Sequence, residues 1–152
     1  MFSHILVPLD GSHLAESALP AAMALAAKFD STITLLRVVR PPEITTSTVG
    51  SPMTEVLTML RTHSQEEADS YLQGLQTSLR RQGHMVHRHI ILGDMVANLI
   101  LEVAEGHDVD TIVMSTHGRS GLSRWVFGSV ADKVLRRAEV PVLLIRGQAD
   151  EV

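Results

Sequence analysis

The sequence contains no cysteine. This absence excludes disulfide frameworks, thiolate-ligated zinc, iron–sulfur clusters and a cysteine nucleophile. The sequence also lacks an excess of basic residues, because 13 Lys and Arg stand against 17 Asp and Glu and give a formal net charge of −4. Nucleic-acid binding depends on a basic surface that displaces counterions, so we expect no nucleic-acid partner.

Long apolar runs are absent as well. The longest, residues 18–27, is well short of the ~18 residues that a transmembrane helix requires, so we expect no membrane partner. The amino-terminal segment has no basic region, and Asp10 interrupts its only early apolar run, which argues against a signal peptide. These absences predict a cytoplasmic protein.

The residues that are present are typical of one folded domain. The chain has 152 residues, 45% of them hydrophobic, and a mean hydropathy of +0.15, which is too apolar for general disorder. A chain of this length buries enough surface to fold without a disulfide or a metal. We predict a single domain over 1–147 and a polar tail over 148–152.

Short apolar segments alternate with segments of helical pattern along the chain. The predicted strands are 5–9, 32–39, 85–92, 111–114 and 142–145, and the predicted helices are 13–29, about 53–82, 95–105 and about 129–138. Strands that read as continuous apolar runs are buried on both faces, and helical crossovers between them imply parallel pairing. We therefore predict a doubly wound α/β fold with an open, parallel, five-stranded sheet in the order 3-2-1-4-5.

Four residues predict where helices bend or end. Pro20 lies inside the first predicted helix and should remove a main-chain hydrogen bond there, so we expect a kink. Asp94 should cap the third predicted helix, and Gly83 and Gly106 should each end the helix that precedes them.

Two strands have the composition of sheet edges. The third contains His87-Arg88-His89, and polar residues of this kind protect an exposed edge. His84, His87 and His89 also suggest a metal site, but no carboxylate is placed to join them, so we favour the edge interpretation. The fifth strand is apolar throughout, so either a helix covers it or it pairs with its own copy across a two-fold axis.

The loops after the first and fourth strands hold the candidate ligand site, because ligands of open α/β sheets bind at the carboxyl ends of strands where the chain order reverses. The first loop is 8–12, and the second runs over 115–121 and on to Gly128 and Ser129. Glycines let the backbone approach a ligand, and a helix amino-terminus attracts phosphate. The second loop therefore predicts an anion site, although the lysine-bearing P-loop pattern and the G-x-G-x-x-G pattern are both absent.

A purely structural role stays open for these residues. Ser129 and Asp132 match a capping box, so Ser129 could be only a helix N-cap. Asp10 and Ser12 could together cap the first helix. The loop glycines could serve only as turn residues.

The sequence resembles the universal stress proteins over nearly its whole length, from Ile5-Leu6-Val7-Pro8-Leu9-Asp10-Gly11-Ser12 to Pro141-Val142-Leu143-Leu144-Ile145. The resemblance implies a Rossmann-like fold of the adenine-nucleotide alpha-hydrolase type. The ATP-binding branch of that family carries G-x2-G-x9-G-[ST], which Gly118, Gly128 and Ser129 match. Ser115 replaces the first glycine, and it would weaken ATP binding if this position required a positive φ.

The resemblance also implies roles for single residues. Asp10 matches an aspartate that contacts the ribose hydroxyls, and Val38 matches a position whose backbone reads the adenine edge, although Val38 is also consistent with core packing. Gly118, Gly128 and Ser129 match residues that hold the phosphates, usually with a divalent metal such as Mg²⁺ or Mn²⁺. The predicted nucleotide-binding residues are Pro8, Asp10, Ser12, Val38, Met114, Ser115, His117, Gly118, Arg119, Gly121, Gly128, Ser129 and Val130.

The expected function is that of an ATP-binding regulatory protein rather than an enzyme. ATP would order the loop 115–128, and an unidentified protein partner would read the changed surface. The resemblance further implies a homodimer joined through 142–145. Two alternatives stay open, namely a slow ATP hydrolase and an interaction module that works without a nucleotide.

Overall fold

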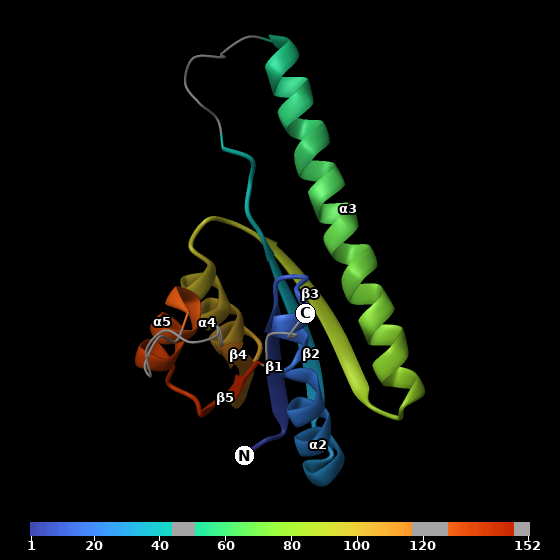
Figure 1. The fold of residues 1–152 in the computed structure, drawn as a ribbon, viewed down its shortest axis with the longest axis vertical. Helices are drawn as coiled ribbons and strands as arrows, with labels where there is room; N and C mark the ends of the chain where they lie inside the picture. Colours follow the sequence, from blue (N-terminus) through green and yellow to red (C-terminus); the bar gives the residue numbers. More distant parts are fainter. Residues whose placement is uncertain (44–50, 117–127, 148–152) are drawn as a thin grey trace.

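The protein is described here by a computed structural model that covers residues 1–43, 51–116 and 128–147. Its five strands are all parallel and pair in the order β3-β2-β1-β4-β5 (Figure 1). They are β1 (His4–Leu9), β2 (Thr32–Val39), β3 (Met85–Leu92), β4 (Thr111–Thr116) and β5 (Val142–Arg146). The predicted fold class and strand order are confirmed. The predicted tail, 148–152, lies outside the described residues.

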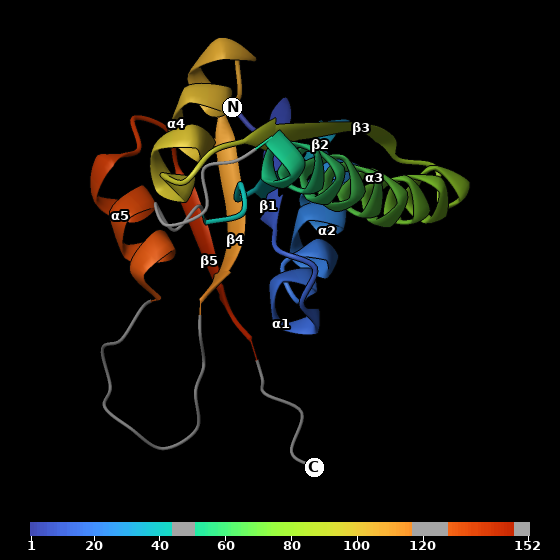
Figure 2. The ribbon, with the colours of Figure 1, turned by 90° about the horizontal axis from the view of Figure 1, so that it is seen from above.

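Five helices cover the two faces of this sheet (Figure 2). They are α1 (His13–Glu16), α2 (Leu19–Phe29), α3 (Ser51–Arg81), α4 (Val96–Gly106) and α5 (Ser129–Arg137). The helices α1, α2 and α3 lie on one face, and α4 and α5 lie on the other. None of the helices in the described ranges is long and apolar enough to cross a membrane.

The continuous apolar strands are explained by burial on both faces. In β1, Ile5 and Val7 pack with α1, α2 and α3, whereas Leu6 packs with α4 and α5. All three side chains are fully buried, because successive residues of a strand point to opposite faces. By the same rule, the side chain of Arg37 in β2 points to the layer of α1, α2 and α3, and that of Val38 points to the layer of α4 and α5.

The predicted single helix over 13–29 is wrong, because the chain forms two helices with Ser17 and Ala18 between them. Ala18 is the N-cap of α2, so Pro20 lies in the first turn of a new helix. A proline loses no hydrogen bond there, because the amides of a first helical turn have no partner within the helix. The expected kink is therefore a complete break.

Helix ends agree with the sequence only in part. Gly83 has φ +91° and donates its N–H to the Arg80 carbonyl (3.0 Å), which ends α3 as predicted. Asp94 does not cap α4, whose N-cap is Met95 without a side-chain hydrogen bond. Gly106 is the last residue of α4 rather than its stop, and Asp108 takes the left-handed conformation beyond it (φ +52°).

The third strand forms one edge of the sheet, as its polar residues predicted. His89 lies against His107, with ring centroids 4.9 Å apart. No three His or acidic side chains within residues 1–43, 51–116 and 128–147 are grouped so that they could hold a metal ion. Beside this edge α3 packs against the sheet with its carboxyl-terminal part, and its amino-terminal part extends beyond the sheet (Figure 1).

Candidate nucleotide site at the carboxyl end of the sheet

The strand order reverses between β1 and β4. From β1 the chain builds outward to β2 and β3 on one side, and β4 and β5 lie on the other. At such a point the loops after the two central strands diverge and leave a crevice at their carboxyl ends. The expectation that the first and fourth strands are neighbours is confirmed. Asp10 directly follows β1, and Thr116 is the last residue of the adjacent strand β4.

Pro8 explains why β1 and β4 pair over only a short stretch. β1 pairs with β2 along its whole length, but with β4 only at Ile5 and Leu6. The His4 carbonyl accepts a hydrogen bond from the Asp110 N–H (3.1 Å), so main-chain groups of even-numbered β1 residues point toward β4. Pro8 has no N–H to continue this ladder. The pairing of β1 with β4 consequently ends at Leu6, before the carboxyl-terminal parts of the two strands.

Asp10 and Ser12 form the turn that follows β1. Asp10 Oδ1 accepts the Ser12 N–H (2.9 Å) and the Ser12 hydroxyl (2.5 Å). Ser12 Oγ in turn accepts the Ala15 N–H (3.1 Å) and caps α1. The capping role is therefore confirmed, and it fixes Oδ1 while the other carboxylate oxygen, Oδ2, accepts neither of the bonds from Ser12.

The Asp10 carboxyl is held in its charged form. Burial raises its pKa, but the two hydrogen bonds from Ser12 and the nearby Arg37 guanidinium outweigh burial, and the net pKa is lower than usual. A carboxylate of this kind accepts hydrogen bonds from hydroxyl groups.

Val38 lies one residue beyond the last β2 residue that pairs with β1. Leu9 pairs with Arg37, and Val38 pairs with Ile91 of β3 on the opposite side. The Thr32 N–H donates to Ser3 (2.9 Å), so even-numbered β2 residues direct main-chain groups toward β1. Val38 therefore presents a carbonyl toward the end of β1, while its side chain packs against the α4 and α5 core. Core packing and a main-chain contact are compatible at this position.

Met114 and Ser115 both lie within β4, before the second loop begins. Met114 is buried in the α4 and α5 core. Ser115 pairs with Ile145 of β5 and has no positive φ. The serine thus occupies ordinary strand backbone, and the left-handed conformation that would favour glycine is not required here.

The amino-terminus of α5 contradicts the capping-box interpretation of Ser129. The N-cap is Gly128, which has no side chain with which to cap the helix. Ser129 is the first helical residue, and the Asp132 carboxylate binds Arg136 Nε (2.9 and 3.0 Å) instead of returning to the helix start. Val130 packs against the core. Among the described residues, the first amides of α5 therefore receive no side-chain cap, and a helix start of this kind accepts an anion.

Four predicted residues, His117, Gly118, Arg119 and Gly121, lie outside the described residues. Those that the structure does place come from the ends of β1, β2 and β4 and from the start of α5. These ends meet at one edge of the sheet because the strands are parallel. The placed residues are Pro8, Asp10, Ser12, Val38, Met114, Ser115, Gly128, Ser129 and Val130.

Sequence reasoning missed Arg37, which is the charged residue of β2. Its Cζ lies 5.6 Å from the centroid of the Tyr71 ring, and its guanidinium fills the space where Gly11 would carry a Cβ. The Tyr71 hydroxyl donates to Glu16 Oε1 (2.8 Å). A charge within a buried apolar strand is the sequence signal that would have identified Arg37.

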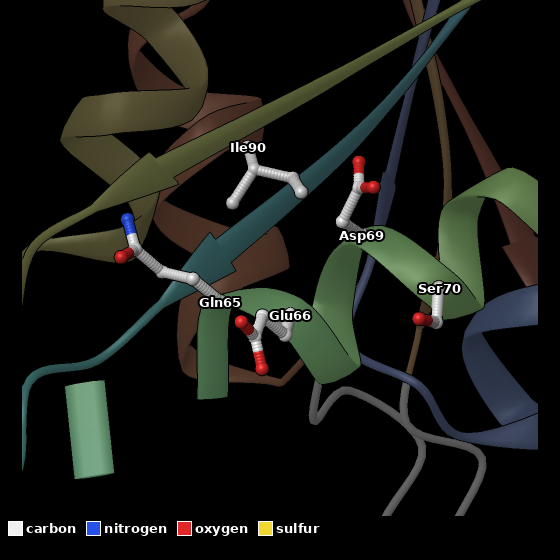
Figure 3. A pocket seen from close by; sticks show the side chains of 5 residues that line it. All are labelled: Gln65, Glu66, Asp69, Ser70 and Ile90. Carbon is white, nitrogen blue, oxygen red and sulfur yellow. The ribbon is translucent and has the colours of Figure 1, made fainter. Parts of the chain in front are cut away.

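A separate groove of about 570 Å³ lies between α3 and β3. Gln65, Glu66, Asp69 and Ser70 from α3 and Ile90 from β3 line this groove (Figure 3). Asp69 binds Arg88 Nε at 2.9 Å. Because two carboxylates line it, the groove does not suit a polyphosphate, and we do not place the nucleotide there.

Comparisons with known proteins identify the family of the chain and agree with its fold. The model of the universal stress protein family matches residues 1–146. Universal stress protein MJ0531 of Methanocaldococcus jannaschii is 31% identical over 146 residues, which cover 96% of this chain and 83% of the relative. The solved structure of hypothetical protein MJ0577 has a TM-score of 0.81 and 29% identity, with 99% of each chain covered.

A second solved structure, universal stress protein UspA from Lactobacillus plantarum, has a TM-score of 0.79 at 24% identity and covers 95% of this chain and 98% of its own. At this identity it supports the fold alone. The family match over nearly the whole sequence decides the assignment, and the chain belongs to the universal stress protein family.

Proposed function

We propose that this protein binds ATP at the carboxyl end of the sheet and acts as a regulatory nucleotide-binding protein. The observation that carries the proposal is the end of β1–β4 pairing at Leu6, with the charged Asp10 directly after β1. The uncapped start of α5 follows the other strand. A cleft with a hydroxyl acceptor and a helix amino-terminus suits a ligand that carries both a sugar and phosphates.

Each part of ATP has a matching group in this proposal. The adenine edge would meet the main chain at Val38, and the ribose hydroxyls would bind the Asp10 carboxylate. The phosphates would bind the amides of Gly128 and Ser129 together with the segment between β4 and α5. A bound Mg²⁺ or Mn²⁺ would neutralise phosphate charge, and we assign its ligands to the phosphates themselves.

Regulation would follow from binding rather than from turnover. ATP would change the surface beside the end of β4 and the start of α5, and a protein partner would recognise the changed surface. Because Asp10 is engaged by Ser12, we assign it to ligand binding rather than to proton transfer. We further propose that the protein acts in the cytoplasm.

Calorimetric titration with ATP and MgCl₂ tests this proposal. Wild-type protein should bind saturably, and Asp10→Asn should bind at least about tenfold more weakly, because a neutral amide accepts weaker hydrogen bonds than a carboxylate. Asp30→Asn is the matched control, since Asp30 is an exposed carboxylate at the end of α2 with φ +55° and asparagine tolerates this conformation. No binding at millimolar ATP would remove the proposal, and phosphate release abolished by Asp10→Asn would replace it with a hydrolase.

We also propose that two copies pair through β5. This strand is the other edge of the sheet, and Leu143 on it is 39% exposed. An apolar edge strand offers unpaired main-chain groups to a second chain, and a two-fold axis lets the strand pair with itself.

A further inference from the structure

Arg37 is the charged residue within the buried strand β2. Its neighbours in the sheet are Leu9 of β1 and Ile90 of β3, so its side chain leaves the sheet between apolar partners. Arg37 faces α1 and α3, whereas Val38 faces α4 and α5. A guanidinium in this place must have partners that offset its desolvation.

Two parts of the chain lie against the Arg37 guanidinium, namely the turn after β1 and the helix α3. It occupies the space beside Gly11, in the turn after β1, where any Cβ would overlap it. Its Cζ lies 5.6 Å from the centroid of the Tyr71 ring on α3, a cation–π geometry. Tyr71 is itself tied to α1 by the hydrogen bond from its hydroxyl to Glu16 Oε1 (2.8 Å). The guanidinium therefore joins the turn after β1 to α3, and Tyr71 joins α3 to α1.

The turn that Arg37 contacts is the turn that carries Asp10. Gly11 has φ +88°, and the residues on either side of it, Asp10 and Ser12, are hydrogen-bonded to each other. Movement of this turn would therefore move the Asp10 carboxylate. The positive charge of Arg37 also acts on this carboxylate through space.

We propose that Arg37 is a positioning residue that orients Asp10 toward the sugar and thereby makes the site select ribonucleotides over 2′-deoxyribonucleotides. The proposal rests on the proposed function, because it assumes that Asp10 receives the ribose hydroxyls. Arg37 need not touch the nucleotide, since its side chain leaves the sheet on the face opposite to Val38. It acts by fixing the turn and the charge of the carboxylate.

The selectivity has a simple physical basis. A carboxylate that is held in place and charged gains one strong hydrogen bond from the 2′-hydroxyl, and 2′-deoxy-ATP lacks this donor. A mobile carboxylate could adjust to the 3′-hydroxyl alone, so the affinities for ATP and 2′-deoxy-ATP would become nearly equal. The phosphates and the adenine bind elsewhere, so the affinity for 2′-deoxy-ATP should depend little on Arg37.

The test compares the affinities of ATP and 2′-deoxy-ATP by calorimetry in the presence of MgCl₂. Wild-type protein should prefer ATP by about tenfold, the effect of one hydrogen bond to a charged group. Arg37→Met keeps the apolar stem and removes the charge, and it should reduce the preference to less than about threefold with similar affinity for 2′-deoxy-ATP. Arg37→Lys restores the charge and should recover part of the preference. Arg81→Met, an exposed arginine in the last turn of α3, is the matched control and should keep it.

Two further variants keep the test decisive if Arg37→Met does not fold, which thermal denaturation would show. Tyr71→Leu removes the ring beneath the guanidinium and should lower the preference. Tyr71→Phe keeps the ring and loses only the bond to Glu16, so it should preserve most of the preference.

The possible failures are distinguishable. If wild-type protein binds neither nucleotide, the proposed function and this inference fall together. A different result is that wild-type protein prefers ATP, that Asp10→Asn loses this preference, and that folded Arg37→Met retains it in full. In that case Asp10 binds the sugar without help from Arg37. That result would overturn the inference and leave the proposed function intact.

Discussion

At the scale of single residues, Gly11 and Gly74 show how two glycines differ in what they tolerate. Gly11 has φ +88°, and an added Cβ would overlap the Arg37 guanidinium. Gly74 lies inside α3 with nothing within 4 Å of the added atom. We expect Gly11→Ala to lower the free energy of unfolding by about 1–3 kcal/mol and Gly74→Ala to raise it by about 0.5–1 kcal/mol. Urea denaturation of both variants measures the two changes, and equal effects would contradict the assignment of strain to Gly11.

Two histidines predict a loss of stability in acid. Burial lowers the pKa of His4 below its usual value, although the His107 carbonyl and Asp110 oppose the shift. The pKa of His89 is also lowered, mainly by burial and to a smaller extent by the nearby His107. Above the usual value of 6.5 both histidines are neutral in the folded and unfolded chain. As the pH falls below 6.5, the unfolded chain takes up protons first, so the free energy of unfolding decreases until the lower folded pKa values are passed.

Urea denaturation at pH 7.5 and at pH 5.5 checks this prediction. The wild-type protein should be less stable at pH 5.5, and the double variant His4→Gln, His89→Gln should lose part of that difference. Identical pH dependence in the wild type and the variant would show that these histidines do not contribute.

The residues of the site differ in how far the sequence could predict them. Asp10 and Ser12 were predicted both as a cap and as ligands, because their types and their place after a strand fit either role. The sequence could not decide whether Ser129 caps α5, since a capping box depends on the backbone of the preceding residue, here Gly128. Arg37 was missed because its partners, Gly11 and Tyr71, come from distant parts of the chain.

At the scale of elements, Pro8 gives a prediction about β1 and β4. Pro8→Val would supply the missing N–H and allow the β1–β4 ladder to continue past Leu6. We expect stability to be unchanged or higher by about 1 kcal/mol, and ATP affinity to fall by about tenfold because the crevice narrows. Calorimetry measures the affinity, and hydrogen exchange should show protection at the main-chain amide that the substitution introduces.

Pro141→Val is the matched control, since Pro141 directly precedes β5 and its carbonyl already accepts the Ile112 N–H (2.9 Å). It should leave ATP affinity unchanged. Weaker binding in Pro8→Val without protection of the introduced amide would mean that Pro8 contacts the ligand rather than separating the strands.

The boundaries of elements show where local sequence signals fail. The alanine-rich segment 13–29 has high helix propensity, so its pattern predicts one helix, but packing and Pro20 divide it into α1 and α2. Asp94 has the right type for an N-cap, yet the N-cap of α4 is the next residue, Met95. Strands were predicted more accurately, because apolar runs mark β1 and β4, whose residues are mostly buried.

At the scale of the whole molecule, fold and site follow from one property of the chain. Strands joined by helical crossovers form a parallel sheet covered on both faces, so the carboxyl ends of all five strands lie at one edge. Identifying the loops after β1 and β4 therefore predicted where the site lies without any knowledge of its distances. The same reasoning could not show how far the two strands separate, which depends on the register that only the structure provides.

The two edges of the sheet predict how the molecule assembles. The middle of β3 carries the exposed polar side chains His87 and Arg88, and exposed apolar residues lie only at its two ends. The middle of β5 instead carries Leu143, which is apolar and 39% exposed. If copies pair through β5, Leu143→Lys places like charges near the two-fold axis, and the dimer should dissociate about tenfold or more readily. Leu135→Lys on α5 is the matched control, because Leu135 is 41% exposed and lies outside the strand. Light scattering during gel filtration should find a dimer for wild type and Leu135→Lys, and a monomer for Leu143→Lys. A dimer in all three proteins would place the interface elsewhere, and a wild-type monomer would exclude the pairing.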